Sequence, residues 1–284
     1  MVTIGVIGNG FVGKATSILE CNGISVIYYD INPDLCKPKE TSIANICECD
    51  LIFISVPTPM NKDGSCYLNI VNSVVKQIKD YVSLDEKIVI IRSTVPVGTS
   101  ANLNCYFMPE FLTEKNYLDD FKNNQDWIFG LKGCDKQDVI FKKTITELFN
   151  TCYNQNCINS KNIHFVTTGE AEMIKLFRNS FLATKVAFCN EIYQFCNLKK
   201  VDYKNVRKLA VLDNRIGESH SYVPGSDGKY GFGGTCFPKD IHSLIYQMEQ
   251  LDMDSYILQA TQNRNENIDR VDKDWEKNKG RSVV

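Results

Sequence analysis

The sequence predicts an α/β protein in which a doubly wound parallel sheet comes first and a mainly helical part with one long helix follows. Apolar runs recur along the first half of the chain with helical segments between them, and the first run ends in a glycine-rich turn. Residues 170–195 contain no proline and are rich in helix-forming side chains. Continuous apolar runs are typical of parallel strands that are buried on both faces. We therefore place a sheet domain over residues 1–166 and a helical domain over residues 167–284.

The composition is that of an ordinary soluble globular protein. The 284 residues include 32 Lys and Arg against 34 Asp and Glu, and 43% of them are hydrophobic. This balance of charge favours neither nucleic acid nor a membrane surface as a partner. The chain has no apolar run of the roughly 18 residues that cross a bilayer. Because the N-terminus also lacks the pattern of a signal peptide, we expect a cytoplasmic protein.

Twelve cysteines are spread along the chain without the spacing of a metal site. No two form a C-x-x-C pair, and His164, His220 and His242 stand outside metal-binding spacings. We therefore predict no metal site, and free thiols that are mostly small buried apolar residues. Cys236 alone follows the glycine-rich run GFGG.

The first predicted strand, residues 3–7, leads directly into a turn with the spacing G-x-G-x-x-G, formed by Gly8, Gly10 and Gly13. A helical segment follows over residues 14–21. In this context the first glycine permits a tight turn, the second lets a pyrophosphate approach the backbone, and the third lets the helix pack on the strand. The pattern predicts a Rossmann-type domain that binds a dinucleotide.

The second predicted strand, residues 25–29, ends in Asp30, 22 positions after Gly8. A carboxylate at this place accepts hydrogen bonds from the ribose 2′-hydroxyl and repels a 2′-phosphate, so we predict NAD rather than NADP. The alternative role for Asp30 is to open the turn before Pro33, and that role is compatible with binding a cofactor.

Two further strands end in polar residues. The run over residues 51–56 leads into Pro57 and Thr58, and the run over residues 88–92 leads into Ser93 and Thr94. Ligands of a parallel sheet bind beyond the carboxyl ends of its strands, so these side chains are expected beside the cofactor.

Two glutamates follow the next apolar stretch. Glu110 and Glu114 would share one face if the segment after Pro109 is helical. A solvated helix edge is the bland alternative for such a pair. Residues 127–133 and 163–166 are strand-like, with an amphipathic stretch over 138–150 between them.

One long helix is predicted over residues 170–195. Lys175 and Asn179 are four residues apart on it and face the same way, although alone they would be taken for surface residues. The polar tail, residues 262–281, is expected to be at best a frayed helix.

Cys236 follows a glycine-rich stretch and precedes a predicted helix. Pro238 suits the first turn of that helix, and a cysteine near a helix N-terminus is favoured as a thiolate. Asp240 lies four residues further on. A random cysteine is most often a buried apolar residue, but this context favours a reactive thiol.

Six separated segments resemble, in order, the motifs of the UDP-glucose/GDP-mannose dehydrogenase family. The resemblance implies an NAD-dependent, four-electron oxidation of a nucleotide sugar, with UDP-glucose as the expected substrate, by a homodimer formed through the long helix. It also implies a third, C-terminal domain, which we expect the 284 residues not to include. The segments are GNGFVG, VPTP, STVPVGT, MPEFLTE, EAEMIKLFRNSFLATKVAFCNE and GFGGTCFPKD.

The resemblance also implies roles for individual residues. The nucleophile is Cys236, and the other residues of the catalytic centre are Lys175, Asn179, Asp240, Glu110, Glu114 and Thr94. Besides the glycines of the turn, the cofactor contacts are Phe11, Val12, Asp30, Pro57, Thr58, Thr94 and Lys239. The sugar-nucleotide contacts are Glu110, Lys175, Asn179 and Gly233. Lys229, in the glycine-rich loop, is either a phosphate ligand or a solvated surface lysine.

Two alternative functions remain open at this stage. A two-electron dehydrogenase of a small 3-hydroxyacid also combines a Rossmann domain with a long helix that carries Lys and Asn, and Cys236 argues against it. A protein that binds NAD or a nucleotide sugar without catalysis is the other, because a site rather than a fold determines function.

Overall fold

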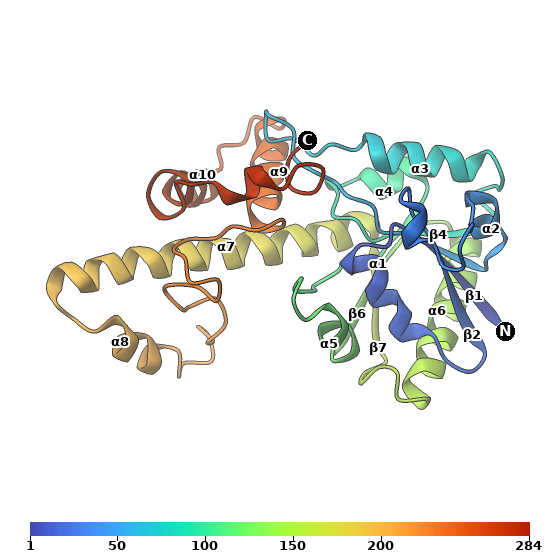
Figure 1. Ribbon diagram of the computed structural model, residues 1–284, viewed down its shortest axis with the longest axis horizontal. Helices are drawn as coiled ribbons and strands as arrows, with labels where there is room; N and C mark the ends of the chain where they lie inside the picture. The colour runs from blue at the N-terminus through green and yellow to red at the C-terminus, as the bar shows by residue number, and fades with distance from the viewer. The chain divides into compact units, whose positions relative to one another are not determined.

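The computed structural model describes all 284 residues, which divide into two compact units (Figure 1). Unit 1 comprises residues 1–58 and 68–175, and unit 2 comprises residues 59–67 and 176–284. No helix is both long and apolar enough to cross a bilayer. All twelve cysteines are free thiols.

Unit 1 contains a seven-stranded sheet with the order β2-β1-β3-β4-β5-β6-β7. All neighbouring pairs are parallel except β5 and β6, which are antiparallel. The predicted fold class is thus confirmed, but a uniformly parallel sheet is wrong at this one pair. Because β5 and β6 are antiparallel, the chain leaves β5 and enters β6 at the same end of the sheet, so the connection needs no crossover. The strands are β1 (Val2–Ile7), β2 (Ile24–Tyr29), β3 (Leu51–Ile54), β4 (Ile88–Ile91), β5 (Tyr106–Phe107), β6 (Asp126–Leu131) and β7 (Asn162–Thr167).

Both faces of the sheet are covered by helices, which explains the continuous apolar runs (Figure 1). In β3, Leu51 and Phe53 belong to one core while Ile52 and Ile54 belong to the other, and all four are fully buried. Alternate side chains of a strand point to opposite faces, so both sets must be apolar. The first core includes α1 (Phe11–Ala15), α5 (Tyr117–Lys122) and α6 (Asp135–Asn154); the second includes α2 (Ile43–Glu48), α3 (Asn69–Lys79), α4 (Thr99–Leu103) and the start of α7 (Thr168–Lys199).

The segment after Pro109 is not helical, so the expected helix face shared by Glu110 and Glu114 is wrong. The next helix, α5, begins only at Tyr117. The cause is local competition for backbone donors. The Leu112 N–H donates to the Glu110 side chain at 2.9 Å, and the N–H of the following residue donates to Asp120 at 2.7 Å.

Unit 2 is built on α7, which begins in unit 1 and confirms the predicted long helix. Phe232 packs with Ile241 and Ile245 in its core. The further elements are α8 (Tyr203–Ala210), α9 (Phe237–Glu249), α10 (Tyr256–Arg264), the π-helical turn η3 (Asn265–Asp269) and the 3-10 turn η4 (Asp274–Lys277).

The tail is folded, so the expectation of a frayed helix is wrong. Trp275 is 1% exposed and Arg270 is 3% exposed. The loop of residues 59–67 belongs to the same unit, because the Met60 N–H donates to the Ser282 carbonyl at 2.8 Å and the Val284 N–H donates to the Met60 carbonyl at 3.0 Å. Isolated anchors of this kind leave no helical period in the sequence.

Candidate functional site

The glycine-rich turn of unit 1 has the geometry that a dinucleotide requires. Gly8 has a φ of +91°, and a Cβ there would lie 2.6 Å from the Ser55 carbonyl oxygen. A Cβ on Gly13 would lie 1.9 Å from the Gly8 carbonyl oxygen. Around Gly10, by contrast, nothing lies within 4 Å of the Cβ position. Two glycines are thus required by close packing, and the third leaves open space beside the backbone that suits a pyrophosphate.

Asp30 is fixed beside this turn at the end of β2. One carboxylate oxygen accepts a hydrogen bond from the Asn9 N–H at 2.7 Å, and the other accepts one from the Asn32 N–H at 2.9 Å. Asp30 therefore does open the turn, as its alternative role requires. Its carboxylate also lies next to the glycine-rich turn, where it suits a ribose. The residues present fit NAD.

The ends of β3 and β4 lie together, as expected. The Thr58 hydroxyl donates to the Thr94 carbonyl at 2.7 Å, and the Ser93 hydroxyl donates to the carbonyl of Val56, next to Pro57, at 2.6 Å. Thr58 and Ser93 are 5% and 6% exposed. These bonds fix the carboxyl ends of β3 and β4, which lie beside the glycine-rich turn.

Lys175 forms a buried ion pair within unit 1. Its ammonium lies 2.7 Å from a carboxylate oxygen of Glu110 and 2.7 Å from the Glu110 carbonyl oxygen. The two side chains are 4% and 5% exposed. Lys175 is therefore not a surface residue, and that interpretation is wrong. Glu114, the second glutamate of the predicted site, is exposed. A buried, paired lysine at the start of a long helix is a candidate for a functional charge.

In unit 2, Asp240 accepts hydrogen bonds from two side chains. The Asn179 amide donates to one carboxylate oxygen at 2.5 Å, and the Lys239 ammonium donates to the other at 2.5 Å. Asp240 is 1% exposed and Asn179 is 7% exposed. The reading of Asn179 as a surface residue is therefore wrong as well. Asn179 and Lys175 are one turn apart on α7.

Cys236 is the N-cap residue of α9, with Pro238 in the first turn, as the sequence predicts. Its thiol is partly exposed, and the Thr235 hydroxyl lies 3.8 Å from the sulfur. Burial alone would lower the pKa of Lys239, but the charges of Asp240 and Cys236 raise it above its usual range. The Lys239 charge, which interacts with that of Cys236, and the helix N-terminus both favour the thiolate.

The two loop residues expected to contact substrate, Lys229 and Gly233, lie against acidic side chains of unit 2. The Lys229 ammonium lies 2.8 Å from Asp272 and 3.1 Å from Asp274. A Cβ on Gly233 would lie 2.3 Å from Asp274 Oδ1. The Lys229 side chain is 45% exposed and paired with two carboxylates, so of its two alternatives the arrangement is nearer to a surface lysine than to a phosphate ligand.

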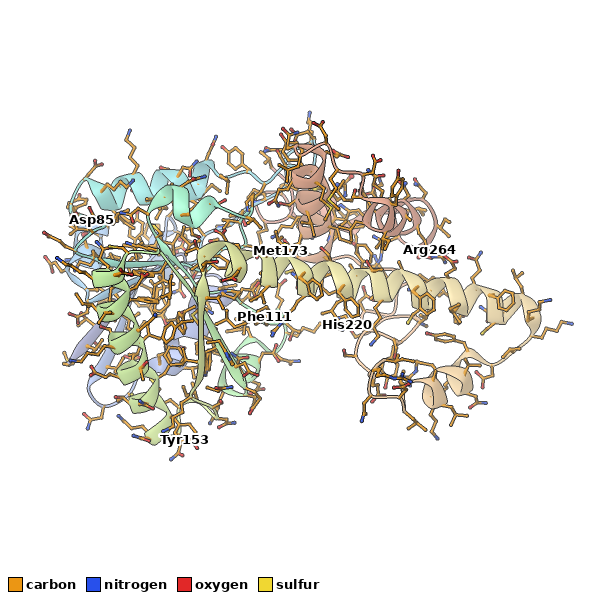
Figure 2. The ribbon with its side chains drawn as sticks, turned by 180° about the vertical axis from the view of Figure 1, so that it is seen from behind. Asp85, Phe111, Tyr153, Met173, His220 and Arg264 are labelled. Carbon is orange, nitrogen blue, oxygen red and sulfur yellow. The ribbon has the colours of Figure 1, made fainter.

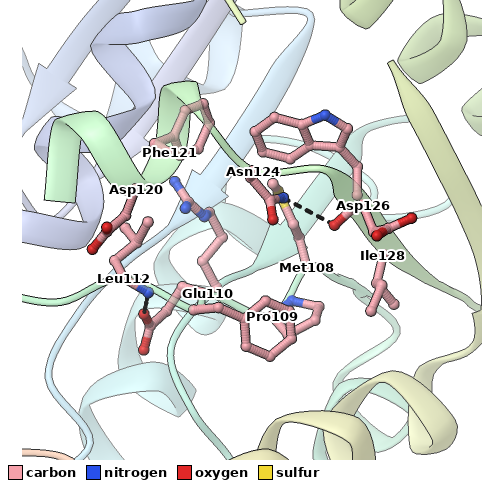
Figure 3. Close-up of a pocket in the computed structure, with 12 residues that line it drawn as sticks. Met108, Pro109, Glu110, Leu112, Asp120, Phe121, Asn124, Asp126 and Ile128 are labelled. Atoms are coloured by element: carbon pink, nitrogen blue, oxygen red, sulfur yellow. Dashed lines mark hydrogen bonds between the residues drawn. The ribbon is translucent and has the colours of Figure 1, made fainter. Parts of the chain in front are cut away.

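Sequence reasoning missed a buried arginine near the dinucleotide turn. Arg92 is 1% exposed and donates to the Val12 carbonyl at 3.2 Å and to the Thr16 hydroxyl at 2.7 Å. Burial lowers its pKa to about 10. It lines a small pocket with Glu110, Asn124 and others (Figure 3). The only signal was a charged residue at the end of an apolar run.

Two family profiles match most of the chain. The NAD binding domain of the UDP-glucose/GDP-mannose dehydrogenase family matches residues 37–153, and the central domain of that family matches residues 169–267. The first match, with the open glycine turn, makes NAD the cofactor of unit 1.

Named relatives agree with these matches. UDP-glucose 6-dehydrogenase from Pseudomonas aeruginosa is 33% identical over 237 residues, which cover 78% of this chain and 49% of the relative. A putative UDP-glucose 6-dehydrogenase from Bacillus subtilis is 31% identical, with coverage of 77% and 51%. The chain thus spans about half the length of these relatives.

Solved structures share the architecture. UDP-glucose dehydrogenase from Pyrobaculum islandicum has a TM-score of 0.79 and 26% identity over 94% of this chain and 68% of that one. GDP-mannose dehydrogenase from Pseudomonas aeruginosa has a TM-score of 0.64 and 26% identity, with coverage of 93% and 68%. A 3-hydroxyisobutyrate dehydrogenase from Mycobacterium tuberculosis has a TM-score of 0.67 at 13% identity, with coverage of 93% and 92%, which shows a shared fold alone.

Proposed function

Because the chain belongs to the UDP-glucose/GDP-mannose dehydrogenase family, we propose that it oxidises the primary alcohol of UDP-glucose to the carboxylate of UDP-glucuronate. The observation that carries the proposal is the partly exposed Cys236 thiol at the start of α9, next to the Lys239–Asp240 ion pair. A four-electron oxidation needs a covalent adduct from which a second hydride can leave, and a thiol supplies it. NAD accepts a hydride in each of the two oxidations.

In the first oxidation, the alcohol loses its hydroxyl proton as the hydride leaves. We assign this proton to a water molecule held by Asp240, whose carboxylate is fixed by Asn179 and Lys239. Lys175 and Asn179 stabilise the negative charge that develops on the alcohol oxygen. The buried pairing of Lys175 with Glu110 supports this role, because it holds the ammonium in one position.

In the second oxidation, the Cys236 thiolate attacks the aldehyde carbon. A carbon–sulfur bond forms, the carbonyl oxygen takes back the proton from the water held by Asp240, and a thiohemiacetal results. The adduct becomes a thioester when its hydroxyl proton returns to this water and its hydride leaves to the second NAD. The Lys239 charge and the start of α9 support the thiolate that the attack requires.

Hydrolysis of the thioester completes the reaction. A water molecule attacks the thioester carbon, the carbon–sulfur bond breaks, and the product leaves as a carboxylate. We assign the proton of this water to Glu114, with Glu110 in support. The exposed position of Glu114 is compatible with access to water.

We further propose a cytoplasmic homodimer. Twelve free thiols suit a reducing compartment. The part of α7 in unit 2 carries four exposed phenylalanines, and the rings of Phe177 and Phe181 stack with their centroids 6.2 Å apart. Exposed aromatic groups of this size favour an interface between subunits. The four are Phe177 (61% exposed), Phe181 (60%), Phe188 (63%) and Phe195 (56%).

The test is the number of NADH molecules formed for each UDP-glucose consumed, followed by NADH absorbance with excess NAD. We expect two for the unaltered protein. Cys236→Ser should stop after one NADH, or slow turnover by at least about 100-fold, since serine is a far weaker nucleophile. Cys134→Ser is the matched control, because Cys134 is an exposed thiol outside the site.

Each other outcome has a definite meaning. Full four-electron turnover by Cys236→Ser would exclude the covalent route. One NADH per substrate in the unaltered protein would favour the two-electron dehydrogenase. No NADH with UDP-glucose, with another UDP sugar or with GDP-mannose would leave a binding protein.

A further inference from the structure

The backbone that leads to Cys236 is held by one buried amide. Asn265 is 1% exposed; its oxygen accepts from the Phe232 N–H at 2.8 Å, and its nitrogen donates to the Phe232 carbonyl at 2.9 Å. The preceding Gly231 N–H donates to the Asn190 side chain at 3.1 Å. A single side chain thus pairs both backbone groups of a residue four positions before the thiol.

A buried arginine binds the residues that come just before Phe232 in the same loop. Arg270 is 3% exposed, and its Nε donates to the Tyr230 carbonyl at 2.8 Å. Its other nitrogens donate to Asp274 at 2.8 Å and to Asp227 at 2.7 Å, and one of them lies 3.5 Å from the Gly231 carbonyl. Only the planar, five-donor guanidinium can serve carbonyls and carboxylates in several directions at once.

The loop backbone lies close to these residues at Gly231. Gly231 has a φ of +63°, and a Cβ there would lie 2.3 Å from Asn265 Oδ1. This is far inside ordinary contact distance. The segment after α10 therefore approaches the loop so closely at Gly231 that a larger residue would not fit there.

The π-helical turn after α10 explains how both side chains reach the loop. Asn265 directly follows Arg264, the last residue of α10 (Figure 2). The Arg270 N–H donates to the Asn265 carbonyl at 2.7 Å, a bond between residues five apart. In an α-helix such residues point about 140° apart. The wider π turn brings them nearer to one face, and such turns are frequent at functional sites.

We propose that Asn265 and Arg270 are positioning residues for the nucleophile: they fix the loop backbone and thereby the Cys236 thiol at the start of α9. The loop transmits this constraint because Phe232 packs on Ile241 and Ile245 of that helix. The inference rests on the proposed role of Cys236 and adds two residues that act through the loop backbone they bind.

The experiment compares Asn265→Ala and Arg270→Lys with a matched control, Asn267→Ala. Asn267 is exposed on the same π turn. The first readout is the rate at which iodoacetamide alkylates Cys236, followed by peptide mass spectrometry across a pH series. The second is kcat and KM with UDP-glucose and NAD. Thermal unfolding establishes that each variant is folded.

Both positioning variants should raise the apparent pKa of Cys236 and slow its alkylation at neutral pH by about two- to fivefold, because the thiol loses its place at the helix start. They should also lower kcat by roughly 10- to 100-fold, with KM for NAD unchanged. The Asn267→Ala protein should match the unaltered one. If Asn265→Ala does not fold, Arg270→Lys decides, since it keeps the charge.

Unaltered alkylation and kcat in the folded variants would overturn the inference while leaving the proposed function intact. Conversely, altered alkylation in a protein that oxidises no nucleotide sugar would refute the proposed function and leave the positioning role standing.

Discussion

Removing one partner of the buried Lys175–Glu110 pair should destabilise unit 1 strongly. The perturbation is Lys175→Met, which keeps the volume and removes the charge. The ammonium and the carboxylate oxygen are 2.7 Å apart, and the side chains are 4% and 5% exposed. At this distance, with an effective dielectric constant of about 20, two unit charges attract by about 6 kcal/mol. Desolvation offsets part of this attraction, so breaking the pair should cost about 3–5 kcal/mol.

The assay is urea unfolding of Lys175→Met, Glu110→Gln and the double variant. Each single variant removes one charge of the pair and leaves the other buried, whereas the double variant removes both. The double variant should therefore be more stable than the sum of the two single effects predicts, by at least about 2 kcal/mol.

Additive effects, within about 0.5 kcal/mol, would refute the reasoning. They would mean that the two side chains do not interact in the folded protein. A cost near zero for Lys175→Met alone would refute it as well, because the buried Glu110 charge would then not depend on Lys175.

Two further predictions concern charge at other places. Asp30→Ala should lower the preference for NAD over NADP by roughly tenfold or more, because the carboxylate that repels a 2′-phosphate is gone; the ratio of the two kcat/KM values measures this, and an unchanged ratio would contradict it. Burial opposes ionisation of Glu266, but hydrogen bonds from His242 and Lys273 hold its pKa at about 2, below the usual 4.5 of a glutamate. The lowered pKa stabilises the fold above pH 4.5, and this contribution is lost as the pH falls from 4.5 towards 2. Urea unfolding of Glu266→Gln across this range should show a shallower acid dependence than the unaltered protein, and equal slopes would count against the assignment.

The parts of the site that the sequence predicts are those encoded by neighbouring residues. The glycine turn, Asp30 at the end of β2 and Cys236 at the start of α9 each depend on a short segment whose residue types have a direct steric or electrostatic meaning. Such signals need no knowledge of distant contacts.

The parts that could not be predicted depend on distant partners. Lys175 is buried because Glu110, 65 positions earlier, neutralises it. The tail is ordered because Asn265 and Arg270 bind backbone 33 and 40 positions away. A window of sequence contains one partner of each pair, and one partner alone is indistinguishable from a solvated surface residue.

Residues 59–67 belong to unit 2, although unit 1 flanks them in the sequence, and this affects the order in which the two units can fold during synthesis. Every residue of unit 1 has been made once synthesis reaches residue 175, so its sheet can close early. Unit 2 needs that early loop and also Ser282 and Val284, whose backbones bond to Met60. These bonds join residues more than 200 positions apart, so Met60 is made long before the residues to which its backbone bonds in unit 2.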